Sequence, residues 1–86
     1  MAASADDFHA ELTRLREAAQ ELGFSAIELT AGNLHRRVGG YPGEDHRIPV
    51  CCDVMRQEMR AMDNVLEEPP KGKGASLKIR YQIGST

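Results

Sequence analysis

An α+β fold of the winged helix-turn-helix type is predicted by three observations in this 86-residue sequence. An amphipathic helix begins near Pro49, a Lys/Gly-rich turn follows Val65 and Leu66, and an alternating strand runs from Leu77 to Ile83. The first half supplies a helix, a short strand and a second short helix. We therefore expect three helices with a C-terminal β-hairpin wing, in the order H1-S1-H2-H3-S2-wing-S3.

A single domain spanning residues 1–86 is expected, because a chain of this length has room for only one small core. The sequence has neither an apolar run of about 18 residues nor a basic-then-apolar leader, which favours a cytoplasmic protein. Its two cysteines, Cys51 and Cys52, are adjacent in a predicted helix, where neighbouring side chains diverge and do not bridge each other.

The charges are unevenly distributed, although the net charge is only −2. Six acidic and two basic side chains give residues 1–30 a charge of −4, whereas residues 31–60 and 61–86 each carry +1. The basic side chains thus concentrate in the predicted binding helix and wing, which favours a nucleic-acid partner.

The first helix is expected from about Ala5 to Leu22. Ser4 or Asp6 can cap its N-terminus, and Gly23 stands where helices commonly end. Apolar residues recur at spacings of four and three and should form one core-facing stripe: Phe8, Leu12, Leu15, Ala19 and Leu22.

A short strand from Phe24 to Leu29 should follow, with Ile27 and Leu29 pointing inward. Thr30 can then cap a short helix over residues 31–38, which ends at the glycine pair 39–40. Residues 39–47 contain glycine, proline and charged residues, as expected of an exposed connection between helices.

Pro49 suits the first turn of a third helix, where its missing N–H costs nothing. One face of this helix should pack on the first helix; it carries Cys51, Val54, Met55, Glu58, Met59 and Met62. The opposite face carries Asp53, Arg56, Gln57 and Arg60, with His46 and Arg47 at the entrance. Arginine and glutamine side chains pair with base edges, and a helix fits the major groove. The alternative is an ordinary solvated charged face.

The C-terminal hairpin should carry cations at its tip and along one face. Prolines 69 and 70 mark the end of one arm, glycines 72 and 74 suit the turn, and Lys71 and Lys73 sit at the tip. Lys78 and Arg80 alternate with apolar residues, so one strand face closes the core and the other can meet phosphates. Such lysines also serve to discourage pairing at a strand edge.

These patterns define a candidate nucleic-acid-binding set. In it the third helix enters the major groove, Arg36, Arg37 and Arg47 meet phosphates, and the wing contacts the backbone. The set comprises Arg36, Arg37, His46, Arg47, Arg56, Gln57, Arg60, Lys71, Lys73, Lys78 and Arg80. Asp53 weakens this interpretation, because a carboxylate on the reading face repels phosphate unless it pairs with Arg56 or accepts from a cytosine amine.

Catalytic and metal-binding interpretations are weaker. His35 and His46 are eleven residues apart and the cysteines are adjacent, whereas structural zinc takes ligand pairs two to four residues apart. A Cys–His nucleophile lacks an orienting third residue, and the glycines at 39–43 lack the context of a phosphate loop. We identify no catalytic residue and no cofactor.

A family resemblance rests on three sequence segments: LHRRVGGYPG at 34–43, HRIPVCC at 46–52 and PPKGKGASLKIRY at 69–81. The chain resembles, from about Ile27 to Tyr81, a small bacterial winged-helix-like domain of uncharacterised type, found alone or beside HNH-type nucleases. This resemblance implies a module that acts on DNA in regulation, defence or mobile elements, without catalytic residues of its own. The chain lacks the metal-binding histidine cluster of those nucleases.

The sequence leaves two functions open. The first is a DNA-binding module for duplex DNA. The second is a protein-interaction adaptor of the same fold, docking through its acidic first helix or residues 39–47; a homodimer would be compatible with both. A continuous positive surface over the third helix and wing would favour DNA, whereas interruption by Glu44, Asp45, Asp53 and Glu67 would favour a protein partner.

Overall fold

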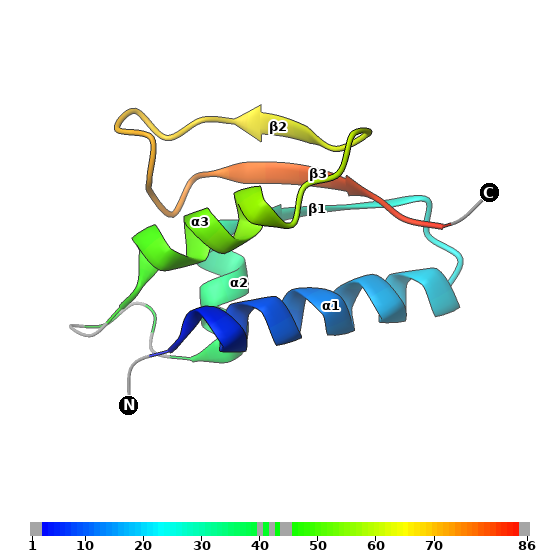
Figure 1. Cartoon of the computed structure of the whole chain (residues 1–86), viewed down its shortest axis with the longest axis horizontal. Helices are drawn as coiled ribbons and strands as arrows, with labels where there is room; N and C mark the ends of the chain where they lie inside the picture. The colour runs from blue at the N-terminus through cyan, green and yellow to red at the C-terminus, as the bar shows by residue number, and fades with distance from the viewer. Residues whose placement is uncertain (1–2, 40, 42, 44–45, 85–86) are drawn as a thin grey trace.

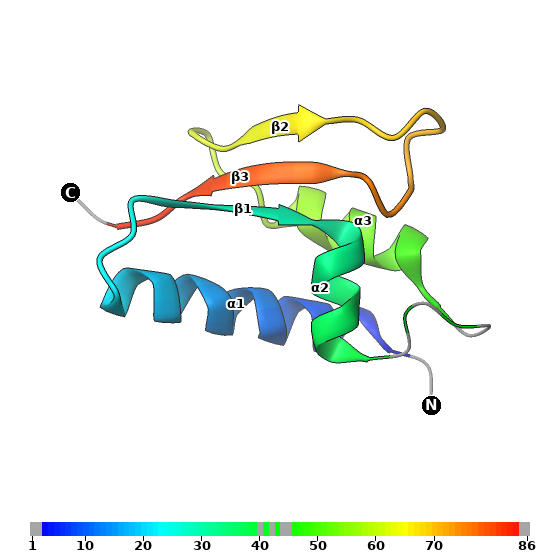
Figure 2. The same ribbon diagram turned by 180° about the vertical axis from the view of Figure 1, so that it is seen from behind.

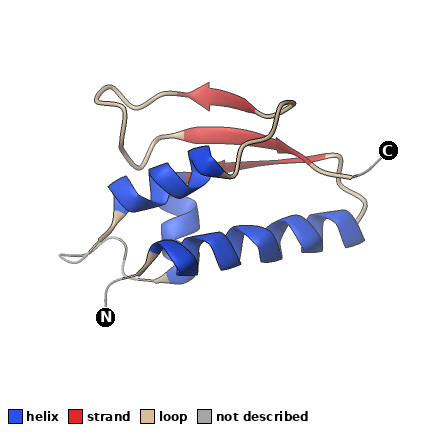
Figure 3. Ribbon diagram, in the orientation of Figure 1, coloured by secondary structure: helices blue, strands red, loops and turns tan. Residues whose placement is uncertain are grey.

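The computed structural model describes residues 3–39, 41, 43 and 46–84 of the chain. Three helices and three strands follow one another in this described part (Figures 1 and 3). Their order is α1 (Ala5–Glu21), β1 (Ala26–Thr30), α2 (Ala31–Val38), α3 (Ile48–Gln57), β2 (Asn64–Glu67) and β3 (Lys78–Gln82). The mixed α+β class expected from the sequence is therefore confirmed. No helix in the described part of the chain is long and apolar enough to cross a membrane.

The strands form one antiparallel sheet in the order β1-β3-β2. The central strand β3 pairs along its length with β1, with Ile27 opposite Tyr81 and Leu29 opposite Ile79. On its other side β3 pairs with β2, whose register shifts between Val65 and Glu67. Strand β1 and the short, irregular β2 are thus the two edges of the sheet.

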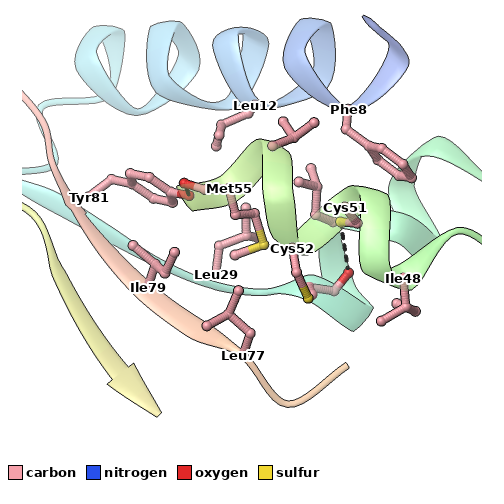
Figure 4. Packing of buried hydrophobic residues seen from close by; sticks show 13 residues of the cluster. Phe8, Leu12, Leu29, Ile48, Cys51, Cys52, Met55, Leu77, Ile79 and Tyr81 are labelled. Atoms are coloured by element: carbon pink, nitrogen blue, oxygen red, sulfur yellow. Dashed lines mark hydrogen bonds between the residues drawn. The ribbon is translucent and has the colours of Figure 1, made fainter. Parts of the chain in front are cut away.

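The core lies between the sheet and the helices, where the three helices pack against one another (Figure 4). Alternation in β3 buries Leu77, Ile79 and Tyr81, while Arg80 and Gln82 are exposed, as predicted. Helix α1 contributes Phe8 and Leu12, and α3 contributes its buried face: Ile48, Cys51, Cys52, Val54 and Met55.

The helix starts follow the expected local chemistry. The Ser4 hydroxyl accepts from the N–H of Asp7, and the Asp7 carboxylate accepts from the N–H of Ser4, which forms a capping box at α1. Thr30 caps α2 by accepting from the N–H of Asn33. Gly39 follows the last residue of α2 with φ of 112°, a conformation that side chains disfavour.

The N-terminus of α3 is held by a side chain from α2. The N–H of Arg47 donates to Nε2 of His35 over 2.8 Å, and His35 is fully buried. Nε2 thus serves as the acceptor for a backbone N–H at the start of α3. His35 therefore stabilises the turn between α2 and α3 from inside the core.

Several predictions about apolar residues were wrong. Leu22, expected in the core stripe of α1, is 72% exposed, because the helix ends at Glu21 and the chain turns at Gly23. Phe24, expected at the start of the strand, precedes β1 and is 55% exposed. Met62, expected on the buried face of the third helix, is 73% exposed.

Helix α3 is shorter than predicted, and this displaces Arg60 and Met62 from it. The helix ends at Gln57, and the Asp63 carboxylate accepts from the N–H of Arg60 over 2.8 Å, which stabilises a turn in place of further helix. The other oxygen of Asp63 accepts from the N–H of Gln82, so the turn is fixed to the end of β3. Arg60 therefore cannot belong to a reading face on the third helix.

Candidate nucleic-acid interface

The polar face of α3 contacts the loop that joins β2 and β3, residues 68–77, which we call the wing loop. Arg56 donates to the Glu68 carboxylate over 2.7 Å and to the Gly72 carbonyl over 3.1 Å. Lys73 lies 3.1 Å from the Asp53 carboxylate. Beneath them, the buried Cys52 thiol donates to the Gly74 carbonyl. Helix α3 and the wing loop therefore form one connected surface, the α3–wing surface.

The ion pairs of this surface settle how Asp53 is accommodated. Its carboxylate pairs with Lys73 of the wing loop and not with Arg56, the partner considered from the sequence. Arg56 pairs with Glu68, and that hydrogen bond raises the pKa of the Arg56 guanidinium. Both cations are thus balanced by neighbouring carboxylates, which weakens the field they project to solvent.

Other predicted contacts at the α3–wing surface lack such carboxylates. Gln57 is the last residue of α3 and is exposed, and Lys71 is exposed in the wing loop. Neither side chain takes part in an ion pair or side-chain hydrogen bond among the described residues. They are accordingly the groups on this surface that are available to a partner.

A second group of predicted residues lies at the junction of α2 and α3. The Arg36 guanidinium stands 5.3 Å from the centre of the Tyr41 ring, and the centre of the His46 ring lies 6.0 Å from that of Tyr41. His46 and Arg47 are exposed just before α3 begins. The junction thus combines cations with aromatic rings, as nucleic-acid interfaces do. Glu44 and Asp45, the acidic residues expected to interrupt this region, lie outside the described residues.

Arg37 lies apart from both groups, at the side of α1. Its guanidinium is 3.8 Å from the Glu11 carboxylate, which also accepts two hydrogen bonds from Arg14. The hydrogen bonds from Arg14, supported by the positive charge of Arg37, lower the pKa of Glu11. Arg37 therefore helps to balance a carboxylate of α1.

Lys78 and Arg80 project from the sheet face that turns away from the core, because β3 alternates them with buried residues. Lys78 lies 3.7 Å from the Glu28 carboxylate of β1. The α3–wing surface lies on the helical side of the sheet. The predicted cations are therefore distributed over separate surfaces, and the structure does not bring all of them together.

Sequence reasoning missed a polar network that joins α1 to the end of α3. Arg16 donates to the Glu58 carboxylate and to the Glu58 carbonyl, and its guanidinium lies 4.7 Å above the Tyr81 ring. His9 shares the same carboxylate at 2.7 Å. Since these residues are more than 40 positions apart, no local pattern marks the network, although Glu58 on an apolar face was a weak signal.

The thiols are buried and protonated. Desolvation raises the pKa of Cys51 from 9.0 to about 12, and burial also raises the pKa of Cys52. Thiols of this kind are poor nucleophiles at neutral pH. Among the described residues, no three His, Cys, Asp or Glu side chains are grouped as metal ligands would be.

Comparisons with protein-family models, curated proteins and solved structures give no match to this chain.

Proposed function

We propose that this chain is a DNA-binding module of winged-helix type that binds through α3, the wing loop and the junction between α2 and α3. The observation that carries the proposal is the attachment of the wing loop to α3 by Arg56, Lys73 and Cys52. A helix and a hairpin loop held in one orientation can meet a groove and its flanking backbone without a large ordering cost.

The contacts proposed here differ from those expected from the sequence. Gln57 is the candidate base-reading side chain, because it is exposed at the end of α3. Arg36, Arg47 and Lys71 are the candidate phosphate contacts, because they are exposed and make no ion pair within the described residues. Arg56 and Lys73 fix the shape of the surface in this proposal.

Fluorescence anisotropy of the full chain against random duplex and single-stranded DNA across a salt series tests the proposal. We expect duplex binding that weakens with salt, as phosphate contacts require. Arg47→Ala and Lys71→Ala should each weaken binding to all sequences and reduce the magnitude of the salt slope by about 0.9. Arg80→Ala is the matched control, because it removes an exposed arginine from the other face of the sheet. Absence of binding at low salt would overturn the proposal.

A protein-interaction adaptor is the second candidate. Charge balance favours it: Arg56 pairs with Glu68 and Lys73 with Asp53, so acidic and basic groups alternate over the α3–wing surface. Mixed charges of this kind suit a protein partner better than a phosphate backbone. A pull-down that captures one partner with the wild-type chain, and loses it with Lys71→Glu, would support this function if DNA binding is absent.

A further inference from the structure

One edge of the sheet presents backbone groups that pair with no other strand among the described residues. The N–H of Ile83 donates to the carbonyl of Ser25, and the N–H of Ala31 donates to the carbonyl of Leu77. Because pairing alternates along an antiparallel strand, the odd-numbered residues of β1 bond to β3. Ala26 and Glu28 therefore direct their N–H and carbonyl groups away from the sheet. Such an edge is a template for another strand.

Strand β1 runs beside α1 (Figure 2). Between them lies a groove lined by apolar side chains together with Arg14, Glu28 and Arg37. Its volume is about 390 Å³. Its apolar lining includes Leu15, Ala18, Leu22, Phe24 and Ile27. Two of these side chains are largely solvent-exposed, Leu22 at 72% and Phe24 at 55%. Exposed apolar side chains that adjoin an open strand edge mark a surface that a protein can cover.

The charges on α1 indicate which partner covers the groove. Arg14, Ala18 and Glu21 are spaced by four and three residues, so they form one stripe along α1. Arg14 and Ala18 line the groove, and Glu21 continues the stripe at the end of the helix. Along α1, the stripe presents a positive, a small and a negative side chain in that order. A two-fold rotation about Ala18 places Arg14 opposite Glu21 of a second copy, and the small side chain of Ala18 permits close approach. The stripe is therefore complementary to itself, because the Arg14 guanidinium donates to Glu11 through Nε and Nη2 and keeps Nη1 for Glu21 of the second copy.

Ala18 and Ile27 line the same groove, so a two-fold axis beside Ala18 can also pass beside β1, where the register is acceptable. Centred on Ile27, two copies of β1 place Ala26 opposite Glu28 of the other copy, so that these outward-facing pairs exchange their backbone hydrogen bonds. The two Ile27 side chains then meet on the helical side of the sheet, next to the groove. Centring on Glu28 would instead place two carboxylates opposite each other, which is unfavourable.

We propose that this chain forms a two-fold symmetric dimer in which β1 strands pair across the axis and a second copy of α1 covers the groove. The sheet then continues through both copies and loses one of its open edges. The residues of the α3–wing surface do not line this groove, so the dimer leaves that surface free. The proposal is independent of DNA binding.

Sedimentation equilibrium of the full chain without DNA, over a range of micromolar to millimolar concentrations, tests the dimer. The decisive variant is Glu28→Pro, because it removes an N–H that the chain's own sheet does not use, and proline is tolerated at such edge positions. Glu28→Ala keeps the N–H and is the matched control. We expect the wild type and Glu28→Ala to sediment as dimers and Glu28→Pro to sediment as a monomer. Circular dichroism should show that Glu28→Pro is still folded.

The charge stripe supplies a second test. Arg14→Glu and Glu21→Arg should each raise the dimer dissociation constant by about tenfold or more, and the double variant should recover most of the loss. Recovery requires the two positions to face each other across the axis. A monomeric wild type over the whole range would overturn the proposal, as would folded single variants whose effects simply add in the double variant.

Discussion

At the scale of single residues, Cys51 shows how burial controls chemistry in this protein. The side chain is fully buried, and its thiol donates to the Ala31 carbonyl over 3.5 Å (Figure 4). Desolvation is the main cause of its raised pKa, and the neighbouring Cys52 adds to the shift. Cys51 therefore acts as a packing group that keeps its proton in the folded chain.

This burial predicts an alkaline loss of stability. The unfolded thiol begins to ionise near pH 9.0, whereas the folded thiol stays protonated until about pH 12. The folded state then binds more protons, so the free energy of unfolding falls as pH rises through this window. Urea unfolding at pH values from about 7 to 10 should show a steeper decline for the wild type than for Cys51→Ala. Equal slopes would contradict this account. Burial also raises the pKa of Tyr81 above its ordinary value of 10.0, but this contributes equally to both chains, so the difference between their slopes reports Cys51.

At the scale of elements, the start of α3 depends on a residue in α2. Removal of the His35 ring leaves the Arg47 N–H without its acceptor and opens a cavity beside Phe8, whose ring centre lies 4.9 Å from that of His35. We expect His35→Ala to reduce the free energy of unfolding by about 2–4 kcal/mol, from cavity formation and an unpaired donor together.

Urea denaturation measures this loss, and His46→Ala provides the control. His46 precedes the same helix but is exposed, and its Nδ1 accepts only a long, 3.5 Å hydrogen bond from the N–H of Ile48, so its removal should change stability by no more than about 0.5 kcal/mol. Similar losses for both variants would show that the buried contact of His35 has no special role at the start of α3.

Helix caps and strand alternation could be predicted from the sequence, because each depends on residues close together in the chain. Ser4 and Thr30 act on N–H groups three residues away, so their roles as caps follow from local sequence alone. The alternation in β3 is likewise a local pattern, and the structure confirms it. The predicted buried face of α3 is confirmed for Cys51, Val54 and Met55, whereas Glu58, Met59 and Met62 lie beyond the end of the helix.

The errors arose where distant residues decide the outcome. The end of α3 depends on the Asp63 carboxylate, which is fixed by the N–H of Gln82, 19 positions away. Lys73 is balanced by Asp53, 20 positions away, and Arg56 by Glu68, 12 positions away. Periodicity could therefore identify the candidate cations but could not show which of them are already paired.

At the scale of the whole molecule, charge pairing limits how many cations a partner can use. Nine of the predicted contact residues are lysine or arginine. Four of these make ion pairs: Arg37, Arg56, Lys73 and Lys78. Arg80 projects from the sheet face away from α3, and Arg60 lies beyond the end of the helix.

The proposed binding mode therefore predicts a shallow salt dependence. Three cations remain for phosphate, namely Arg36, Arg47 and Lys71, because they are exposed and make no ion pair within the described residues. Each neutralised phosphate contributes about −0.9 to the slope of log binding constant against log salt concentration, so the slope should be near −3. Use of all nine cations would give about −8 instead. Anisotropy titrations at several salt concentrations distinguish these two slopes. The steeper slope would mean that DNA binding breaks the ion pairs of Arg56 and Lys73 and extends beyond the α3–wing surface.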